Sequence, residues 1–391
     1  MTLNISEKLV RFAKNMVVAG LLMSTGPLCF AKHYLMYVGT YTNAGSKGIY
    51  VYRYDSDSGK VEALGLAAET ENPSFLVSDS AGKHLYGVNE TPKYQGEASG
   101  AVTGFSIDRK SGKLTAINQV SSHGADPCYI SFDRSGKYVL VANYTGGTVA
   151  VFPVAADGKL GEASSVVEDQ GPLGPNHERQ ERSHAHWIEA SARNRFAYVA
   201  DLGLDRVLIY KFDASKGTLG RGEPADSFSA VLDPGTGPRH VAFSKDGKFM
   251  YALAEMDSSV TVFANDNEKY RSIQKISALP QGFSGKNDAA EIVMHPSGKF
   301  LYTSNRGDDS IAVFAVDSAS GKLTSVDRTA TGGKTPRNFA VDPEGKHLLA
   351  ANEETGNVVE FAVDGKTGKL TSAGEVAKVA SAVCVVFVSV E

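Results

Sequence analysis

The chain has 391 residues, of which 42% are apolar and 21% are charged, and its formal net charge is −4. This composition is typical of a soluble globular protein with a sizeable core, and it excludes a disordered or collagen-like chain. The weak negative charge argues against nucleic acid or an anionic membrane surface as a partner, because both attract strongly basic proteins.

The N-terminus has the pattern of a secretory signal peptide. Three basic residues precede a short apolar run at 16–23, and Cys29-Phe30-Ala31 fits a small-residue cleavage site. The apolar run is too short to cross a bilayer. We therefore predict a signal peptide at residues 1–31, a single mature domain at 32–391, and a periplasmic or secreted location.

The mature chain begins with three predicted strands, at 34–41, 48–54 and 61–68. From residue 73 onward, one hairpin recurs six times at intervals of roughly fifty residues. Each copy has a strand, a tight turn and a second strand. The turn residues align at Gly82, Gly136, Asn194, Gly247, Gly298 and Gly345.

Each hairpin is followed by an alternating strand, a turn and a fourth strand. Four short antiparallel strands per repeat of about fifty residues are typical of a propeller blade. The C-terminal run 382–387 looks like a first strand with nothing after it, and the three N-terminal strands lack a first strand. We therefore predict an all-β, seven-bladed β-propeller with four antiparallel strands per blade, closed by one C-terminal and three N-terminal strands. Such a closure leaves no free sheet edge.

One long loop and two cysteines stand apart from the repeat. The longest segment without a predicted strand, 168–182, is polar and rich in Pro and Gly, so we expect it to overhang one face of the ring as a functional loop. Cys128 and Cys384 lie in different repeats, and we predict that both are free thiols, because two cysteines do not make a disulfide framework.

Two rows of residues are predicted to surround one mouth of the central channel, because the first strand of each blade lines that channel. One row opens the first strands and the other closes the second strands, and three arginines, one histidine and three glutamates occur in them. The opening row is Ser74, Cys128, His186, Arg239, Ala290 and Arg337, and the closing row is Glu90, Tyr144, Leu202, Glu255, Arg306 and Glu353. We expect His184 to share the face of His186, since alternate residues of a strand point the same way.

These residue types suit the attack of water on an ester-like carbonyl group. A carboxylate or an imidazole can take a proton from water. Guanidinium groups can stabilise the resulting oxyanion or hold an anionic substrate. Arginines beside a carboxylate would also keep it ionised.

Structural interpretations of the same residues are open. Arg239 and Glu255 can form an ion pair that only pins a hairpin, since such networks also perturb pKa values. His184 and His186 can pack beside a tryptophan, or bind a metal with Glu255 or Glu90 as third ligand. The neighbouring arginines disfavour a cation, so we predict neither a metal nor a cofactor.

At these residues the sequence resembles the lactonase family of seven-bladed propellers, which includes bacterial 6-phosphogluconolactonases and fungal 3-carboxy-cis,cis-muconate lactonizing enzymes. The resemblance spans essentially the whole mature chain. It implies lactone chemistry without a metal, performed by a histidine, arginines and a glutamate. The segments that carry it are Val38-Gly39-Thr40-Tyr41-Thr42, His184-Ala185-His186-Trp187, Asp201-Leu202-Gly203-Leu204-Asp205-Arg206, Gly237-Pro238-Arg239-His240, Ala290-Glu291-Ile292, Ser304-Asn305-Arg306-Gly307 and Pro336-Arg337-Asn338-Phe339.

We therefore predict an exported hydrolase of a sugar lactone, either 6-phosphogluconolactonase-like or acting on an unphosphorylated aldonolactone. The predicted catalytic residues are His184, His186, Arg239, Glu255 and Arg306, and the predicted substrate-binding residues are His240, Glu291, Asn305 and Arg337. The expected partner is a small anionic or polyhydroxylated lactone, bound by a monomer without nucleic acid or membrane. The alternatives are a non-catalytic binding propeller, a lactonizing cycloisomerase of the muconate type, and a metal-dependent lactonase.

Overall fold

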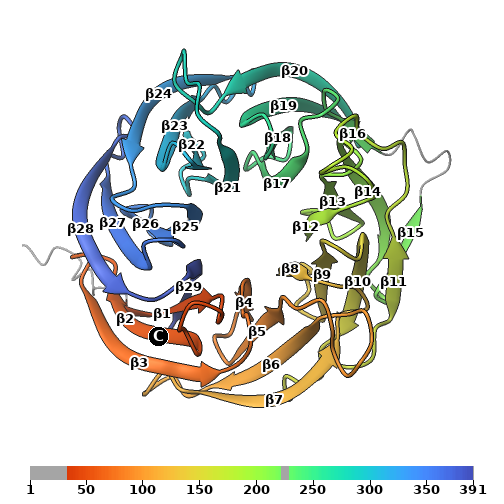
Figure 1. Cartoon of the computed structure of the whole chain (residues 1–391), viewed down its shortest axis with the longest axis vertical. Coiled ribbons are helices and arrows are strands. Elements are labelled where there is room, and N and C mark those ends of the chain that lie inside the picture. Colours follow the sequence, from red (N-terminus) through yellow and green to blue (C-terminus); the bar gives the residue numbers. More distant parts are fainter. Residues whose placement is uncertain (1–32, 222–228, 391) are drawn as a thin grey trace, which may run out of the picture. The chain divides into compact units, whose positions relative to one another are not determined.

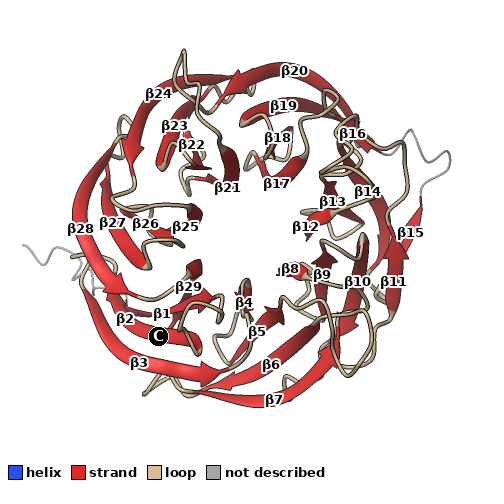
Figure 2. Ribbon diagram, in the orientation of Figure 1, coloured by secondary structure: helices blue, strands red, loops and turns tan. Residues whose placement is uncertain are grey.

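The computed structural model describes residues 33–221 and 229–390, and the predicted signal peptide lies outside these residues. The chain divides into two units, Met1–Ala31 and Lys32–Glu391, and all described residues belong to the second. Figure 2 shows strands and loops but no helix in the described residues. These residues therefore contain no helix long and apolar enough to cross a membrane.

Seven antiparallel sheets surround one axis, with the first strand of each blade innermost (Figure 1). The first three in chain order, written from the axis outward, are β29 (Ala382–Ser389), β1 (His33–Thr40), β2 (Gly48–Asp55) and β3 (Val61–Glu69); β4 (Leu76–Ser78), β5 (His84–Asn89), β6 (Ala101–Ile107) and β7 (Leu114–Ser121); and β8 (Pro127–Phe132), β9 (Tyr138–Asn143), β10 (Thr148–Pro153) and β11 (Ser165–Glu168).

The other four sheets follow the same order. They are β12 (Ala185–Ala190), β13 (Phe196–Asp201), β14 (Arg206–Asp213) and β15 (Thr218–Arg221), with β16 (Ser229–Val231) also on β14; β17 (Pro238–Phe243), β18 (Phe249–Ala254), β19 (Ser259–Asp266) and β20 (Lys269–Ser277); β21 (Asp288–Met294), β22 (Phe300–Arg306), β23 (Ser310–Val316) and β24 (Leu323–Ala330); and β25 (Pro336–Val341), β26 (His347–Asn352), β27 (Asn357–Val363) and β28 (Leu370–Lys378). The predicted all-β, seven-bladed architecture is confirmed.

The predicted closure is also present. β29 pairs with β1 in antiparallel register, with Val386 opposite Tyr37 and Val388 opposite Leu35. The last blade therefore combines one C-terminal strand with three N-terminal strands, and the sheet edges that an open ring would expose are absent from this blade.

The repeated hairpin turn has one conformational requirement. The turn residue that aligns in the six copies has a positive φ in each of them, between 56° and 74°. This left-handed region favours glycine. The one exception to glycine is Asn194 (φ 56°), and asparagine is among the residues that tolerate this region best. The conformation explains why the six turns align in the sequence.

Buried tyrosines join neighbouring blades. In three blades a core tyrosine donates its hydroxyl hydrogen to the carbonyl of a turn glycine in the next blade, as Tyr86 does to Gly158 (2.8 Å) and Tyr302 does to Gly368 (2.9 Å). A buried Tyr hydroxyl needs such a partner. Both tyrosines are fully buried, so this recurring position belongs to the core.

A β-bulge at the start of the first strand repeats in five blades. Register shifts occur between Pro127 and Tyr129, Ala185 and Trp187, Pro238 and His240, Ala289 and Ile292, and Pro336 and Asn338. A bulge leaves a residue unpaired and changes the direction of its side chain. The unpaired residues are Cys128, His186, Arg239, Ala290 with Glu291, and Arg337. They include every member of the predicted opening row except Ser74, so the bulges direct this row towards the axis.

Candidate active site

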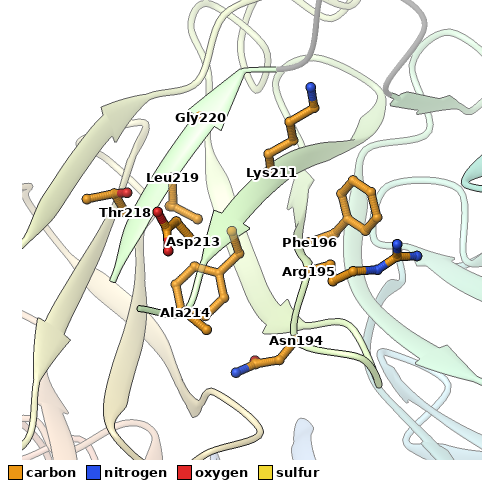
Figure 3. A pocket seen from close by; sticks show the side chains of 10 residues that line it. Asn194, Arg195, Phe196, Lys211, Asp213, Ala214, Thr218, Leu219 and Gly220 are labelled. Atoms are coloured by element: carbon orange, nitrogen blue, oxygen red, sulfur yellow. The ribbon is translucent and has the colours of Figure 1, made fainter. Parts of the chain in front are cut away.

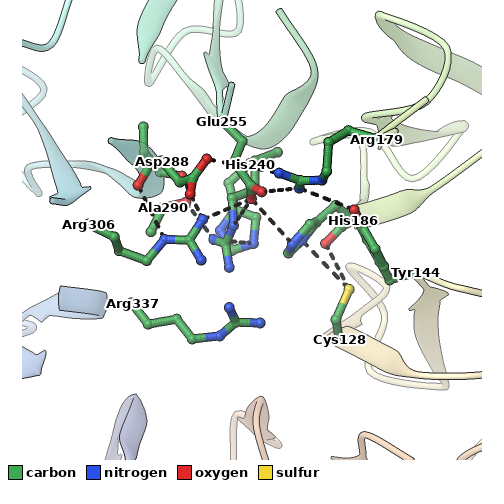
Figure 4. Close-up of polar contacts among 12 residues, drawn as sticks. Cys128, Tyr144, Arg179, His186, His240, Glu255, Asp288, Ala290, Arg306 and Arg337 are labelled. Carbon is green, nitrogen blue, oxygen red and sulfur yellow. Dashed lines mark hydrogen bonds and ion pairs between the residues drawn. The ribbon is translucent and has the colours of Figure 1, made fainter. Parts of the chain in front are cut away.

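Glu255 is the centre of a group of charged side chains at one end of the ring axis (Figure 4). Its carboxylate lies 3.0 Å from Arg239 Nε, 2.9 Å from Arg306 Nη2 and 2.5 Å from Arg179 Nη2. Arg239 and Glu255 come from the two ends of one hairpin, as predicted. We call the group formed by Cys128, Tyr144, Arg179, His186, Arg239, Glu255, Arg306 and Arg337 the axial cluster.

The three arginines decide the ionisation of Glu255. The residue is only 5% exposed, and burial by itself would raise the pKa of its carboxyl group. The charges of Arg306, Arg239 and Arg179 outweigh burial and lower that pKa to about 2. Glu255 is therefore a carboxylate throughout the physiological pH range and a weak proton acceptor.

Arg179 was not predicted from the sequence. It belongs to the segment between β11 and β12, which we expected to overhang one face of the ring. Besides Glu255, it donates to the Tyr144 hydroxyl (3.3 Å) and lies 3.9 Å from Asp288. This segment thus adds a third guanidinium to the two that the repeats supply.

Carbonyl groups of β21 orient two guanidinium groups. Three consecutive carbonyls accept hydrogen bonds from arginines, and the last of them, that of Ala290, lies in the bulge that interrupts pairing with β22. Arg306 donates to the carbonyls of Asp288 and Ala289, both at 3.2 Å, and Arg239 donates to that of Ala290 at 2.5 Å. These bonds fix both side chains next to Glu255.

His186 is the imidazole that faces Glu255. It is the bulged residue of β12 and is 4% exposed, with Nε2 3.9 Å from Glu255 Oε2 and Nδ1 3.6 Å from Cys128 Sγ. Burial lowers its pKa well below the ordinary value, and the charges of Arg239 and Arg337 lower it further. His186 is therefore neutral near pH 7 and able to accept a proton.

His184 has a different environment. Its Nδ1 lies 3.0 Å from the Tyr144 carbonyl, its Nε2 lies 3.1 Å from Glu181, and its ring stacks on that of Tyr144 with centroids 4.5 Å apart. Both ring nitrogens are thus engaged by protein. Among the described residues, no group of three histidine, cysteine, aspartate or glutamate side chains is placed to hold a metal ion.

Arg337 points towards the same centre from β25 (Figure 4). Its guanidinium carbon lies 5.2 Å from the centroid of the Tyr41 ring, and Nη2 lies 3.8 Å from Glu90 Oε1. In the described part of the chain, none of its five N–H groups donates a hydrogen bond to protein. Arg337 therefore has the donors that a bound ligand would need.

Glu90 is the second carboxyl group of the site. It follows β5, and its side chain is 15% exposed. It accepts hydrogen bonds from the hydroxyl groups of Tyr41 (2.8 Å) and Ser74. Burial raises its pKa, and Arg337 and the two hydroxyl groups only partly oppose this effect. The two carboxyl groups thus have opposite electrostatic environments.

Three residues predicted to bind substrate lie behind the axial cluster. His240 Nε2 accepts from Arg239 Nη1 (3.2 Å), so its Nδ1 carries the proton and donates to Glu291 (2.8 Å). Glu291 also accepts from Asn338 (2.7 Å), and Asn305 donates within its own blade to the Ala278 carbonyl (3.1 Å). His240 thus contacts Arg239 directly and Glu291 contacts it through His240, whereas Asn305 is bonded within its own blade.

Two other cavities lack such convergence. One of about 640 Å³ lies along β13 to β15, and its Arg195, Lys211 and Asp213 side chains do not point towards one another (Figure 3). Another, of about 440 Å³, runs along the far ends of the inner strands and is lined mostly by apolar side chains, together with the polar residues Arg134, Glu189, Glu291 and Asn338. The axial cluster is therefore the candidate active site.

Comparisons with known proteins point to one family. A family model described as "Lactonase, 7-bladed beta-propeller" matches residues 35–387. The chain is 38% identical over 308 residues to a 6-phosphogluconolactonase of Bacillus subtilis, covering 78% of this chain and 84% of the relative. It is 34% identical over 311 residues to a 6-phosphogluconolactonase of Formosa agariphila, covering 78% and 85%. The solved structure of a periplasmic gluconolactonase of Pseudomonas aeruginosa is similar with a TM-score of 0.85 and 36% identity, covering 92% of this chain and all of that one.

Proposed function

The chain belongs to the lactonase family of seven-bladed β-propellers, and we propose on that premise that the axial cluster hydrolyses a sugar lactone. The observation that carries the proposal is the arrangement of the axial cluster around Glu255. Three guanidinium groups are fixed around one carboxylate, with a neutral imidazole beside it and a fourth guanidinium whose donors are free. This arrangement meets the two needs of lactone opening, which are a proton acceptor and stabilisation of an oxyanion.

The proton acceptor is His186. Glu255 and the two histidines were equal candidates on sequence grounds, but a carboxylate with a pKa of about 2 is a poor base near neutral pH. His184 has both nitrogens occupied by protein. His186 takes a proton from the attacking water, and the carboxylate 3.9 Å away stabilises the imidazolium that forms.

Arginines stabilise the negative charge that develops on the carbonyl oxygen. Within the described residues, Nη2 of Arg239 and Nη1 of Arg306 donate to no protein group, while their other nitrogens are held by Glu255 and by carbonyl groups of β21. Such preorganised donors need no rearrangement during the reaction. Arg337 supplies further donors to the hydroxyl or carboxyl oxygens of the substrate.

We further propose that the protein is exported and acts on an unphosphorylated aldonolactone. The signal-peptide pattern supports export, and the similar Pseudomonas structure is described as a periplasmic gluconolactonase. The relatives described as 6-phosphogluconolactonases support the phosphorylated lactone as the second candidate.

A pH-stat assay tests both parts of the proposal. Base consumption is measured with glucono-1,5-lactone and with its 6-phosphate, each corrected for spontaneous hydrolysis. We expect the larger kcat/KM on the unphosphorylated lactone. A larger value on the phosphate would reverse the choice of substrate, and no turnover of either would favour a binding protein. Cell fractionation tests export, and recovery in the cytoplasm would contradict it.

A further inference from the structure

Lactone opening requires a proton at a second place. When the acyl carbon–oxygen bond breaks, the ring oxygen leaves as an alkoxide unless an acid protonates it. Arginine does not give up its proton in proteins, and Glu255 is ionised. The Tyr144 hydroxyl and the Cys128 thiol are weak acids, because burial raises the pKa of both groups. We therefore compare the imidazolium of His186 with the carboxyl group of Glu90.

We infer, on the basis of the proposed hydrolysis, that Glu90 donates the proton to the leaving ring oxygen. Glu90 is held by two neutral hydroxyl groups, those of Tyr41 and Ser74, and its nearest cation, Arg337, is 3.8 Å away. Glu255, in contrast, contacts three guanidinium groups at 2.5–3.0 Å. Two carboxyl groups with such different surroundings are what separate acid and base roles require.

The position of Glu90 in the ring fits the role. It follows β5, and Glu255 follows β18; these blades lie on opposite sides of the axis in Figure 1. Arg337 connects Glu90 to the axial cluster, because its Nη2 lies 3.8 Å from Glu90 Oε1 and its side chain points towards the group around Glu255 (Figure 4). Burial lowers the pKa of Arg337, and the charges of Tyr41, Glu90, Glu353 and Glu255 raise it. Glu90 is therefore next to a guanidinium that belongs to the axial cluster.

The steps balance as follows. Water oxygen bonds to the acyl carbon and gives a proton to His186. The bond between the acyl carbon and the ring oxygen breaks, and Glu90 gives its proton to that oxygen. The product is the open hydroxy acid. The Glu90 carboxylate, stabilised by Tyr41, Ser74 and Arg337, is then reprotonated from solvent as His186 releases its proton. The imidazolium of His186 is less suited to the second transfer, because Glu255 holds it on the opposite side.

The leaving group provides the decisive test. Glu90→Gln is compared with wild type on glucono-1,5-lactone and on its 5-thio analogue, whose leaving thiolate is far less basic than an alkoxide. We expect kcat to fall about 100-fold or more on the oxygen lactone and less than about fivefold on the thiolactone. An equal loss on both would overturn the inference. Glu353→Gln also removes a carboxylate whose charge raises the pKa of Arg337, so it is the control for that electrostatic effect and should lose far less activity than Glu90→Gln.

The pH profile provides a test that does not depend on the fold of that variant. Tyr41→Phe and Ser74→Ala each remove a hydrogen bond that favours the ionised form of Glu90, so each should raise its pKa. We expect the alkaline limb of kcat to move to higher pH while the plateau changes little. An alkaline limb that stays in place in both variants would overturn the role of Glu90. Inactive wild-type protein would instead refute the proposed hydrolysis itself.

Discussion

Replacing Glu255 by glutamine should destabilise the fold in a way that depends on pH. The pKa of this carboxyl group falls on folding from its ordinary value of 4.5 to about 2. Such a depression corresponds to about 3 kcal/mol of stability near pH 7. Because the folded pKa is the lower one, this stabilisation is present above about pH 4.5 and is lost as the pH falls towards 2. At pH 3, about 2 of the 3 kcal/mol should be gone.

The assay is denaturant unfolding of wild type and Glu255→Gln at pH 7 and at pH 3. We expect the variant to be less stable by about 3 kcal/mol at pH 7, where the buried Arg239 and the partly exposed Arg306 and Arg179 lose their partner. The gap should shrink to about 1 kcal/mol at pH 3. Other carboxyl groups titrate in both proteins and cancel in the comparison. A gap of equal size at the two pH values would show that the arginines do not depress this pKa.

The control is Glu353→Gln. Glu353 also follows the second strand of a blade, and its charge raises the pKa of Arg337, but within residues 33–221 and 229–390 it has no arginine contacts like the three of Glu255. Its replacement should change stability by less than about 0.5 kcal/mol at either pH. A large loss of stability in Glu353→Gln would mean that removing any carboxylate from the closing row destabilises the ring. The loss in Glu255→Gln could then not be assigned to its three arginine contacts.

Three further predictions concern activity. Arg239→Ala should lower kcat/KM at least about 100-fold while circular dichroism shows an intact fold, because a preorganised oxyanion donor is lost; wild-type rates would remove this arginine from the mechanism. In wild type, the acid limb of kcat/KM should lie at a lower pH than the ordinary imidazole pKa of 6.5, because the pKa of His186 is lowered and the base stays unprotonated. His186→Asn should abolish that limb, and a limb unchanged in the variant would point to another base. Arg337→Met should raise KM more than it lowers kcat, and the reverse pattern would place Arg337 in the transition state instead.

The architecture was predictable because its signals are local and repeated. Hairpin turns need a residue in the left-handed region, so glycine or asparagine recurs at each turn and fixes the register of the blades. The seventh blade followed from the strands left unmatched at the two ends. The contact between Arg239 and Glu255 was predictable as well, because hairpin geometry places the start of one strand beside the end of the next.

Other parts of the site have no such signal. Arg179 lies outside the repeat, in a segment whose path no strand pairing determines. The bulges decide which residue turns towards the axis, so strand alternation alone could not separate His186 from His184. His240, Glu291 and Asn305 were predicted to bind substrate because they are polar and close to the motifs. The sequence shows polarity but not the buried partners that satisfy it.

The pairing of β29 with β1 sets an order of events during synthesis. The first described strand leaves the ribosome early and must wait for the last one before the circle is complete. Until Ala382–Ser389 is available, the incomplete blade keeps an unpaired backbone edge that can recruit a strand from another molecule. A chain that stops shortly before this strand should therefore be recovered as aggregate rather than as a slightly weaker monomer.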